Sequence, residues 1–154
     1  MWNLFKKKKG INVVSPAKGK LIDLSLVDDE VFASKAMGDG FAIELLDTKI
    51  YAPVDGEIQA AFPTGHAFGI LANEIETIVH VGIDTVNLEG KGFHSFVSIG
   101  DNVKAGDLLV ELDQELLENK EYDFTTMVLF PNNSFQNENK KEVVEKGEFI
   151  GYAE

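Results

Sequence analysis

Short hydrophobic runs, separated by glycine, proline and acidic residues, follow one another along most of the 154-residue chain. The runs are too short for ordinary helices, and turn-forming residues bound each of them, which is typical of β-strands. We therefore expect an all-β fold, a compact antiparallel sandwich or barrel with one or two short helices. One segment, Asp113 to Glu121, has a helical pattern, with Asp113 as its cap and Leu116 and Leu117 on its apolar side. The runs are NVVSPAKGKLIDL, GDGFAIELLDTKIYAPVDGEIQAAF, HAFGIL, TIVHVGIDTV, HSFVSIGDNVKAGDLLVEL and VVEKGEFIGYA.

Two pairs of segments resemble each other. SPAKGKLIDL (15–24) and APVDGEIQAA (52–61) share a small residue, a proline and a glycine at the same spacing, and IGDNVKAGDLLVEL (99–112) has a weaker counterpart in VVEKGEFIGYA (143–153). This predicts a duplicated supersecondary unit whose two halves close one core. We expect Gly19 and Gly56 to take positive-φ positions after the prolines.

One of the hydrophobic runs, TIVHVGIDTV (77–86), contains a histidine, His80. The two-residue period of a strand divides this run into two faces, Val79, Val81 and Ile83 against Ile78, His80 and Gly82. His80 can therefore point away from the core without disturbing it.

A second histidine, His66, lies upstream in HAFGIL, and a hairpin centred on Asn73 would place it directly opposite His80. Opposed residues on one face have Cβ atoms about 4.5–5.5 Å apart, so the two imidazoles would meet. A shift of one residue would turn one histidine to the other face. The same register predicts two further pairs, which form an apolar surface beside the rings: Phe68 with Ile78, and Ile70 with Glu76.

Two facing imidazoles can share a proton, a metal ion or a phosphoryl group. Neutral histidine is a competent nucleophile toward phosphorus, because its usual pKa near 6.5 leaves one ring nitrogen unprotonated at pH 7. Thr64 can orient the ring of His66, and Asp84 can offer a carboxylate near His80. Two imidazoles are half of a tetrahedral zinc site, so we expect weak zinc binding at His66 and His80 and no required cofactor. His94 has no evident partner.

The composition excludes several function classes. The net charge is −12 and all fourteen basic residues are lysines, so no arginine fork is present to bind phosphates or base edges, which argues against nucleic-acid binding. The chain has no cysteine, which excludes a disulfide framework, a thiolate zinc site and a cysteine nucleophile. It also contains no secretory signal and no run long enough for a membrane span. We expect a cytoplasmic monomer.

The chain divides into a tail and one domain. Residues 1–12 carry four consecutive lysines and predict a flexible basic tail, and residues 13–154 predict a single domain. Trp2, Leu4 and Phe5 beside the lysines could contact an anionic membrane surface, although an untethered polar tail is the commoner case.

Five segments, IYAPVDGEI, TGHAFGI, VHVGIDTV, LEGKGF and GDNVKAGDLL, resemble in order and spacing the glucose-class enzyme IIA component (type 1) of the bacterial phosphoenolpyruvate-dependent sugar phosphotransferase system. The resemblance runs from about Val14 to Ala153, and the combination of T-x-H-A with V-H-x-G-I-D-T-V is specific to that family. It implies a compact sandwich or barrel-like domain with a shallow active site. The spacing of the two histidines is one residue shorter than in the enteric form, which implies a trimmed hairpin loop.

The resemblance also implies residue roles. His80 would receive a phosphoryl group from a small histidine-containing phosphocarrier protein and pass it to a cysteine on the IIB domain of a sugar-specific IIB/IIC transporter. His66 would assist this transfer, and Thr64 and Asp84 match the threonine and aspartate of the motifs. An arginine of the carrier would supply the cation that this chain lacks. The apolar surface that meets the partners would include Phe32, Phe62, Phe68, Ile70 and Ile78.

Two other classes share fragments of these motifs. His80 and Asp84 spell the H-x-G-x-D of lysostaphin-type zinc peptidases, but those enzymes need a further H-x-H pair, which His94 does not supply. Biotinyl and lipoyl carrier domains share A-P-x-x-G and V-K-A-G-D-x-L, but they are about half as long. Their modified lysine lies at a hairpin tip, whereas Lys104 lies in the scaffold turn.

Overall fold

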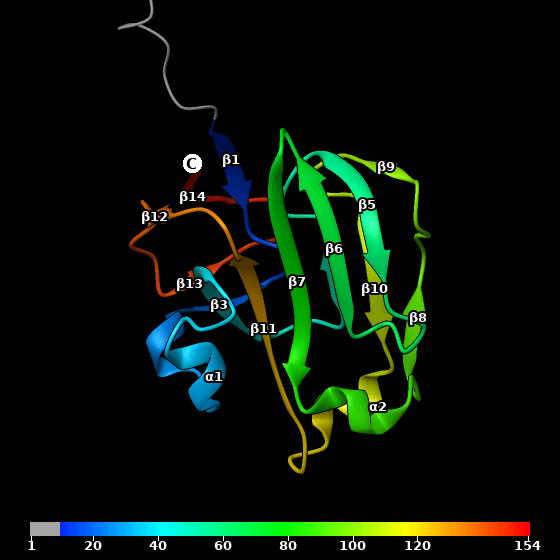
Figure 1. The fold of residues 1–154 in the computed structure, drawn as a ribbon. Coiled ribbons are helices and arrows are strands. Elements are labelled where there is room, and N and C mark those ends of the chain that lie inside the picture. Colours follow the sequence, from blue (N-terminus) through cyan, green and yellow to red (C-terminus); the bar gives the residue numbers. More distant parts are fainter. Residues whose placement is uncertain (1–9) are drawn as a thin grey trace, which may run out of the picture.

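The computed structural model describes residues 10–154, which form mainly antiparallel strands with two short helices, so the all-β prediction is confirmed (Figure 1). Within these residues, no helix has the length and apolar character needed to span a bilayer. The strands are β1 (Ile11–Val14), β2 (Gly19–Asp23), β3 (Asp39–Leu45), β4 (Lys49–Tyr51), β5 (Gly56–Ala61), β6 (Ala67–Ala72), β7 (Ile75–Ile83), β8 (Phe93–Ser95), β9 (Asn102–Val103), β10 (Leu108–Leu112), β11 (Asp123–Phe130), β12 (Phe135–Asn137), β13 (Val143–Val144) and β14 (Phe149–Ala153). The helices are α1 (Glu30–Ala33) and α2 (Gln114–Glu118), with 3-10 turns η2 (Leu24–Leu26) and η3 (Thr85–Leu88).

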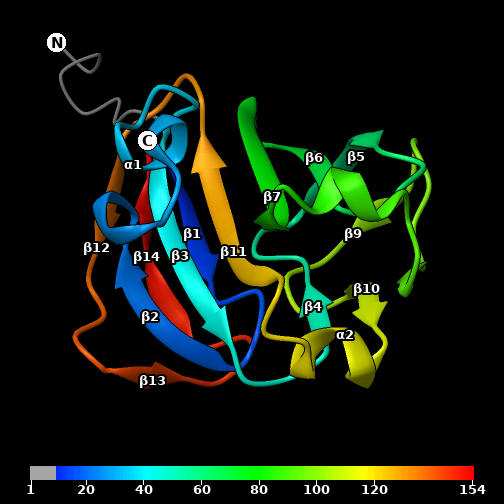
Figure 2. The same cartoon turned by 90° about the horizontal axis from the view of Figure 1, so that it is seen from below.

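The strand order shows the duplication that the repeated segments predicted. An eight-stranded sheet has the order β13-β2-β3-β11-β7-β6-β5-β9, and two three-stranded sheets have the orders β1-β14-β12 and β4-β10-β8. Each strand on one side of the β11–β7 pair has a counterpart on the other side: β3 corresponds to β6, β2 to β5 and β13 to β9. Figure 2 shows β1–β3 and β11–β14 on one side of the molecule and β4–β10 on the other. The two halves therefore meet at β7 and β11.

The glycines of the repeated segments take matching positions, but not the conformation that we expected. Neither Gly19 nor Gly56 has a positive φ, so that prediction is wrong. A Cβ atom on Gly19 would lie 2.2 Å from the carbonyl oxygen of Glu44, and one on Gly56 would lie 2.4 Å from that of Leu71. Each glycine is needed because the backbone of the neighbouring strand, β3 or β6, approaches it closely.

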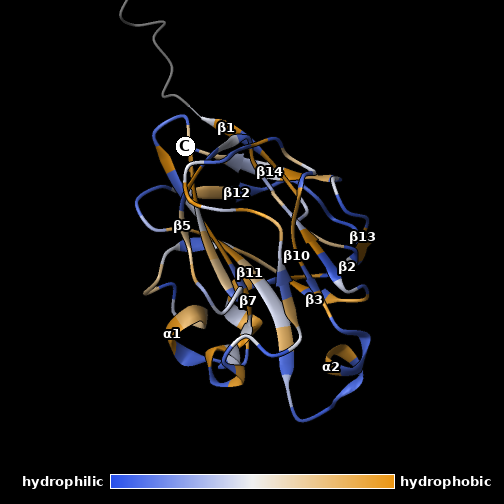
Figure 3. Ribbon diagram, turned by 90° about the vertical axis from the view of Figure 1, so that its right-hand side faces the viewer, coloured by the Kyte–Doolittle hydropathy of each residue, from blue (hydrophilic) through white to orange (hydrophobic). Residues whose placement is uncertain are grey.

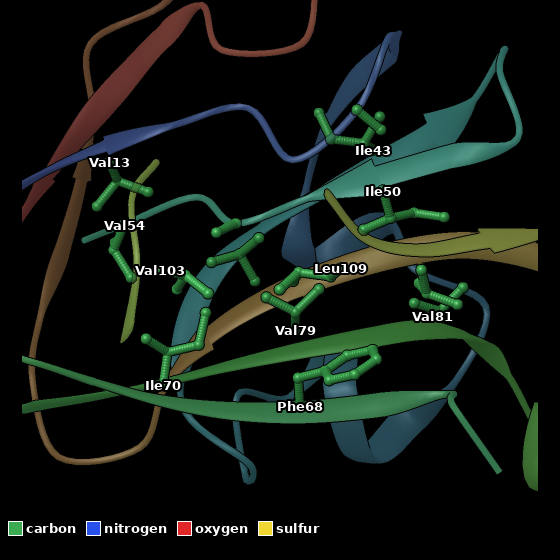
Figure 4. Close-up of a cluster of buried hydrophobic side chains, with 14 of the residues drawn as sticks. Val13, Ile43, Ile50, Val54, Phe68, Ile70, Val79, Val81, Val103 and Leu109 are labelled. Atoms are coloured by element: carbon green, nitrogen blue, oxygen red, sulfur yellow. The ribbon is translucent and has the colours of Figure 1, made fainter. Parts of the chain in front are cut away.

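The main hydrophobic core lies between the sheets, and Val79 and Val81 of β7 are completely buried in it (Figure 4). Figure 3 shows hydrophobic residues along the strands and hydrophilic residues concentrated in the connecting turns. The predicted faces of β7 are correct for these two valines, but wrong for Ile83. Ile83 packs with Ile78 against a second cluster, because the backbone turns at Gly82, where φ is 87° and the alternation of a strand is interrupted.

The second cluster covers the outer face of the sheet in one half of the molecule. Phe32 of α1 and Ile78 of β7 pack against its edge. The connection between β2 and β3 contains η2 and α1, whereas the corresponding connection between β5 and β6 contains no helix. The outer face of β5, β6 and β7 therefore lacks the equivalent cover. The buried members of the cluster are Leu24, Val27, Ala42, Met127 and Leu129.

The β6–β7 hairpin forms, but its register differs by one residue from the prediction. Asn73 and Glu74 make a two-residue turn in which φ is 48° and 68°, respectively. Turns with two positive-φ central residues match the twist of antiparallel strands. This two-residue turn sets the register of the hairpin by placing Ala72 opposite Ile75. His80 accordingly pairs with Ala67 and not with His66. The predicted neighbouring pairs are also wrong, because Phe68 pairs with Val79, Gly69 with Ile78, Ile70 with Thr77 and Leu71 with Glu76.

The folded domain begins earlier than predicted. Ile11 pairs with Ala153 and Asn12 with Tyr152, so both residues belong to β1 and not to the tail. Residues 1–9 of the predicted tail lie outside the described residues, as does the membrane contact that we expected from Trp2, Leu4 and Phe5.

The predicted helix is α2, which starts after Asp113 and ends before the expected Glu121. The Asp113 carboxylate makes no capping hydrogen bond and instead lies 2.7 Å from Nε2 of His94. The short helix α1 has a side-chain cap, because the Asp29 carboxylate accepts hydrogen bonds from the main-chain N–H groups of Val31 and Phe32.

Thr77 of β7 predicts a stabilising substitution. It is completely buried, and its Oγ1 has no hydrogen-bond partner among residues 10–154. Thr77→Val keeps the shape and removes the unpaired hydroxyl, so we expect the free energy of unfolding to rise by about 1 kcal/mol. Thermal unfolding should show a midpoint roughly 2–4 °C higher. Thr126→Val is the matched control: its buried hydroxyl donates to the Phe124 carbonyl, 3.1 Å away, so this variant should lose stability.

Candidate active site

His80 lies on the outer face of β7, between Ala67 of β6 and Met127 of β11. The ring is partly buried, and α1 places the ring of Phe32 beside it, with 5.0 Å between the centroids. Its Nδ1 lies 2.9 Å from the carbonyl oxygen of Gly82. Because a carbonyl can only accept, Nδ1 carries the proton and donates it, and Nε2 of the neutral ring keeps a free electron pair.

His66 is the second histidine of the site, and its side chain is buried, with 4% of the residue exposed. Its ring centroid lies 5.2 Å from that of His80, with the two planes at 81°. The main-chain carbonyl of His66 accepts from the N–H of Val81, so its backbone lies opposite Val81, as the observed register requires. The rings still meet because His66 precedes β6 and follows a turn in which Gly65 has a φ of 72°, so strand alternation does not direct its side chain.

Thr64 lies beside His66, where its Oγ1 is hydrogen bonded to Nδ1 of the ring. The sequence prediction placed this threonine in the same role. Phe62 packs edge-on against the ring of His66, with 5.3 Å between the centroids. The protein therefore engages Nδ1 of both His66 and His80, which leaves both Nε2 atoms for a ligand.

Gly82 gives the site its main acceptor, and only glycine fits its position. Its φ is 87°, and a Cβ atom there would lie 2.3 Å from Cγ2 of Thr85 and 2.9 Å from the carbonyl oxygen of Asp123. β11 has an irregularity opposite this point, between Asp123 and Thr126. The conformation allows the Gly82 carbonyl to face back toward His80 across only one intervening residue.

We expect Gly82→Ala to lower the free energy of unfolding by about 1–3 kcal/mol, because alanine is strained in the left-handed conformation. The clash of its Cβ atom with Thr85 should lower it further. Gly106→Ala is the matched control, because Gly106 has a similar φ of 97° but no atom within 4 Å of an added Cβ. Urea unfolding of both variants separates the two contributions. Equal losses in the two variants would contradict the tight contact described for Gly82.

Burial lowers the pKa of His80, and the neighbouring imidazole of His66 lowers this pKa further. These effects outweigh the Gly82 carbonyl and the carboxylates of Asp29 and Asp84, which raise the same pKa. Burial also lowers the pKa of His66. Both rings are therefore neutral at pH 7 and remain so somewhat below the usual histidine value of 6.5.

The lowered pKa values predict that stability falls on acidification. Between the folded pKa of each histidine and its unfolded value near 6.5, the unfolded chain binds more protons than the folded chain. The stabilisation is thus complete above pH 6.5 and is lost as the pH falls through the folded-state pKa values. Urea unfolding from about pH 7.5 to about pH 5 measures the slope. The double variant His66→Gln/His80→Gln should have a shallower slope, and an unchanged slope would show that other groups cause it.

Two acidic residues act on His80, and the sequence predicted only one of them, Asp84. Asp84 is exposed, starts η3 with a φ of 56°, and makes no hydrogen bond to His80, so it acts on that ring only through its charge. Asp29, which sequence reasoning missed, has the larger electrostatic effect of the two. Its position before Glu30 and a hydrophobic pair was the available signal for a helix cap.

The five residues of the predicted partner surface differ in their exposure. Phe62 is 51% exposed, and Phe32 and Ile78 are partly buried beside the histidines. Phe68 and Ile70 are only 1% exposed and point into the core with Val79 and Val81 (Figure 4). Their assignment to the partner surface is wrong, because the shifted register turns both side chains inward.

A shallow groove of about 310 Å³ continues this surface across the outer face of β5, β6 and β7. Gly69 lies opposite Ile78 in the register, so no side chain fills the space above it. Sequence reasoning missed Gly69, although a glycine inside a strand pattern signals a close approach or a hollow. The other lining residues are Gln59, Ala60, Ile70, Leu71, Glu76 and Thr77.

The site offers few metal ligands. Across the described part of the chain, no three His, Cys, Asp or Glu side chains gather closely enough to hold a metal ion. The two Nε2 atoms could supply two of the four ligands that zinc takes, so an ion there would need the others from outside the chain. His94, on β8, is exposed and hydrogen bonded to Asp113. It therefore completes no peptidase ligand set at His80.

The lysine of the carrier-domain alternative lies in a structural turn. Lys104 is in the connection between β9 and β10, where its main-chain N–H donates to the Asp107 carboxylate, 2.8 Å away. The N–H of the next residue, Ala105, donates to the Asp55 carboxylate. The turn is thus held by the rest of the fold, and this lysine is far in sequence from the paired histidines.

Comparison with known proteins gives relatives that match most of the described chain. A sequence profile described as phosphoenolpyruvate-dependent sugar phosphotransferase system, EIIA 1, matches residues 11–135. The glucose-specific EIIA component of Mycoplasma capricolum is 41% identical over 141 residues, which are 91% of this chain and 90% of that protein. The solved structure of glucose permease IIA from Mycoplasma capricolum matches with a TM-score of 0.85 and 39% identity, covering 94% of this chain and 96% of that one.

A further relative carries the same region within a longer chain. The glucose-specific EIICBA component of Streptococcus pneumoniae is 46% identical over 121 residues, which are 78% of this chain but 17% of that protein. The fold, the paired histidines and these relatives agree on one assignment. The chain belongs to the EIIA type 1 family of the phosphoenolpyruvate-dependent sugar phosphotransferase system and has its place in that system as a phosphotransferase component.

Proposed function

We propose that the protein is a phosphohistidine relay: His80 accepts a phosphoryl group from a histidine-containing phosphocarrier protein and donates it to a cysteine of a sugar-specific IIB domain. The observation that supports this most strongly is the hydrogen bond between Nδ1 of His80 and the Gly82 carbonyl. It leaves Nε2 as the unprotonated nitrogen, on the outer face of the sheet and beside a second imidazole.

The transfer needs no proton movement at His80. A bond forms between Nε2 and phosphorus while the bond from phosphorus to the carrier's imidazole nitrogen breaks, and the carrier's ring keeps that electron pair. The Nδ1–H group stays hydrogen bonded to the Gly82 carbonyl. This hydrogen bond stabilises the positive charge that the ring acquires when Nε2 is phosphorylated. Phosphoryl transfer of this kind depends mainly on positioning and charge stabilisation.

In this proposal, His66 donates a hydrogen bond to the phosphoryl oxygens. When the Thr64 hydroxyl donates to Nδ1 of His66, the proton of that neutral ring is on Nε2. Nε2–H can then donate to a phosphoryl oxygen held on His80, since the two rings lie 5.2 Å apart. Thr64 thereby selects the tautomer of His66, as Gly82 selects that of His80.

The partners follow from the charge and shape of the surroundings. Asp29 and Asp84 act on His80 through their charges, the chain carries a net charge of −12, and it has no arginine, so a cationic partner suits it. Phe32, Phe62 and the groove above Gly69 offer the apolar contact area. Because a relative carries this region together with IIC and IIB in one EIICBA chain, we propose the IIB domain of a IIB/IIC transporter as the acceptor.

We further propose glucose or a related sugar as the transported substrate, because the relatives named above are glucose-specific. We also propose that residues 11–154 act as a single IIA domain, as a monomer on the cytoplasmic side of the membrane, since the profile of the family begins at residue 11.

The proposal is tested by incubating the protein with phosphoenolpyruvate, enzyme I and the phosphocarrier and measuring its intact mass. We expect a gain of one phosphoryl group that is acid-labile and base-stable and that maps to His80. A label on His94, a label on an aspartate, or no gain with an active carrier would contradict the proposal.

A further inference from the structure

Thr85, the first residue of η3, makes two contacts directly behind the active site. It is 1% exposed, and its hydroxyl donates a hydrogen bond to the main-chain carbonyl of Val81. Its methyl group Cγ2 occupies the space beside Gly82, since a Cβ atom on that glycine would lie only 2.3 Å from it. One buried side chain thus touches the peptide unit on the N-terminal side of Gly82 and the α-carbon of Gly82 itself.

These contacts restrict the rotation that orients the Gly82 carbonyl. The hydroxyl holds the Val81 carbonyl, and so fixes the plane of the Val81–Gly82 peptide. The methyl group limits movement of the glycine α-carbon on the other side. A glycine has no side chain of its own to hold a φ of 87°, so the restraint must come from its neighbours. The Gly82 carbonyl is the group that accepts the proton of Nδ1 of His80.

We propose that Thr85 is a positioning residue for phosphoryl acceptance: through Val81 and Gly82 it holds His80 in the Nδ1–H tautomer with Nε2 unprotonated. The inference rests on the proposed function for its kinetic consequence, but not for its structural one. Without the restraint, the Gly82 carbonyl can turn away, and neutral His80 can move its proton to Nε2, the nitrogen that must attack.

The test uses variants that separate the two contacts of Thr85. Thr85→Val removes the hydroxyl and keeps the shape, Thr85→Ser keeps the hydroxyl, and Thr85→Ala removes both. Thr48→Val is the matched control, because it makes the same chemical change at a buried threonine next to β4, which belongs to a different sheet from the histidines. The tautomer of His80 is measured by ¹⁵N NMR, and kcat and KM are measured for phosphorylation by the phosphocarrier.

We expect Thr85→Val and Thr85→Ala to show a mixture of His80 tautomers and a kcat lowered about tenfold, with KM for the carrier unchanged. Thr85→Ser should keep the wild-type tautomer and most of the rate, and Thr48→Val should change neither. A single Nδ1–H tautomer with wild-type kcat in both Thr85→Val and Thr85→Ala would overturn the inference. If the wild-type protein accepts no phosphoryl group, the proposed function fails, and the tautomers of the variants still decide the role of Thr85.

Discussion

Replacing His80 with glutamine should abolish phosphoryl acceptance, with a rate loss of more than about 10⁴-fold, because the attacking nitrogen is removed. The measurement is the transfer of phosphoryl groups from the phosphocarrier, followed by intact mass over time. Glutamine retains hydrogen-bonding capacity and approximate size, so the loss should not come from a cavity beside Phe32 or Met127.

His94→Gln is the control for this variant. His94 is exposed and its Nε2 is already hydrogen bonded to the Asp113 carboxylate, 2.7 Å away, so its replacement should leave acceptance unchanged. Thermal unfolding of both variants shows whether either has lost its fold. A folded His80→Gln protein that still accepts phosphoryl groups would remove His80 from the proposed role.

Replacing His66 with glutamine should have a different effect. The nucleophile remains, so acceptance from the carrier should fall by less than about tenfold, whereas donation to the IIB domain should slow by on the order of 10²–10³-fold, the loss that follows removal of one donor to developing charge. The variant should therefore accumulate as the phosphorylated form. The two half-reactions are measured separately, with purified phosphoprotein and excess IIB domain for the second.

Thr64→Val provides a matched test of the same idea. It keeps the shape of Thr64 and removes the hydroxyl that is hydrogen bonded to Nδ1 of His66, so it should slow donation in the same direction as His66→Gln, but less. Equal slowing of acceptance and donation in His66→Gln would show that His66 acts on both steps and that the proposed division between the histidines is wrong.

Much of the fold could be predicted from the sequence because its local signals agree. Short runs bounded by turn residues indicated strands, and the repeated proline and glycine segments indicated the duplication seen in the strand order. The conformation of Gly19 and Gly56 could not be predicted this way. A glycine that permits a close backbone approach and one that adopts a positive φ give the same letter in the sequence, and only the neighbouring strand distinguishes them.

The sequence predicted correctly that the two histidine rings meet, but not the register of the strands that carry them. The prediction required an odd loop at Asn73, but Glu74 also adopts a positive φ, which its side chain does not signal. The register moved by one residue, and Phe68 and Ile70 turned into the core with it. His66 still meets His80 because it lies before the strand begins, where the preceding turn directs its side chain.

The residues that sequence reasoning missed act through the backbone or through short elements. Helix α1 has only four residues, too few for a hydrophobic period, so the cap at Asp29 was its one clear signal. Gly82 was read as an outward strand position, whereas its carbonyl is the acceptor that sets the tautomer of His80. Main-chain acceptors carry no residue-specific signal, which is why the sequence alone could not identify this one.

Whether Nε2 of His80 carries the phosphoryl group is measured most directly by ¹⁵N and ³¹P NMR of the phosphorylated protein with ¹⁵N-labelled histidine. We expect coupling between phosphorus and Nε2 of His80, with Nδ1 of the same ring still protonated and hydrogen bonded. Phosphorus coupled to Nδ1 of His80, or to a nitrogen of His66 or His94, would contradict the account.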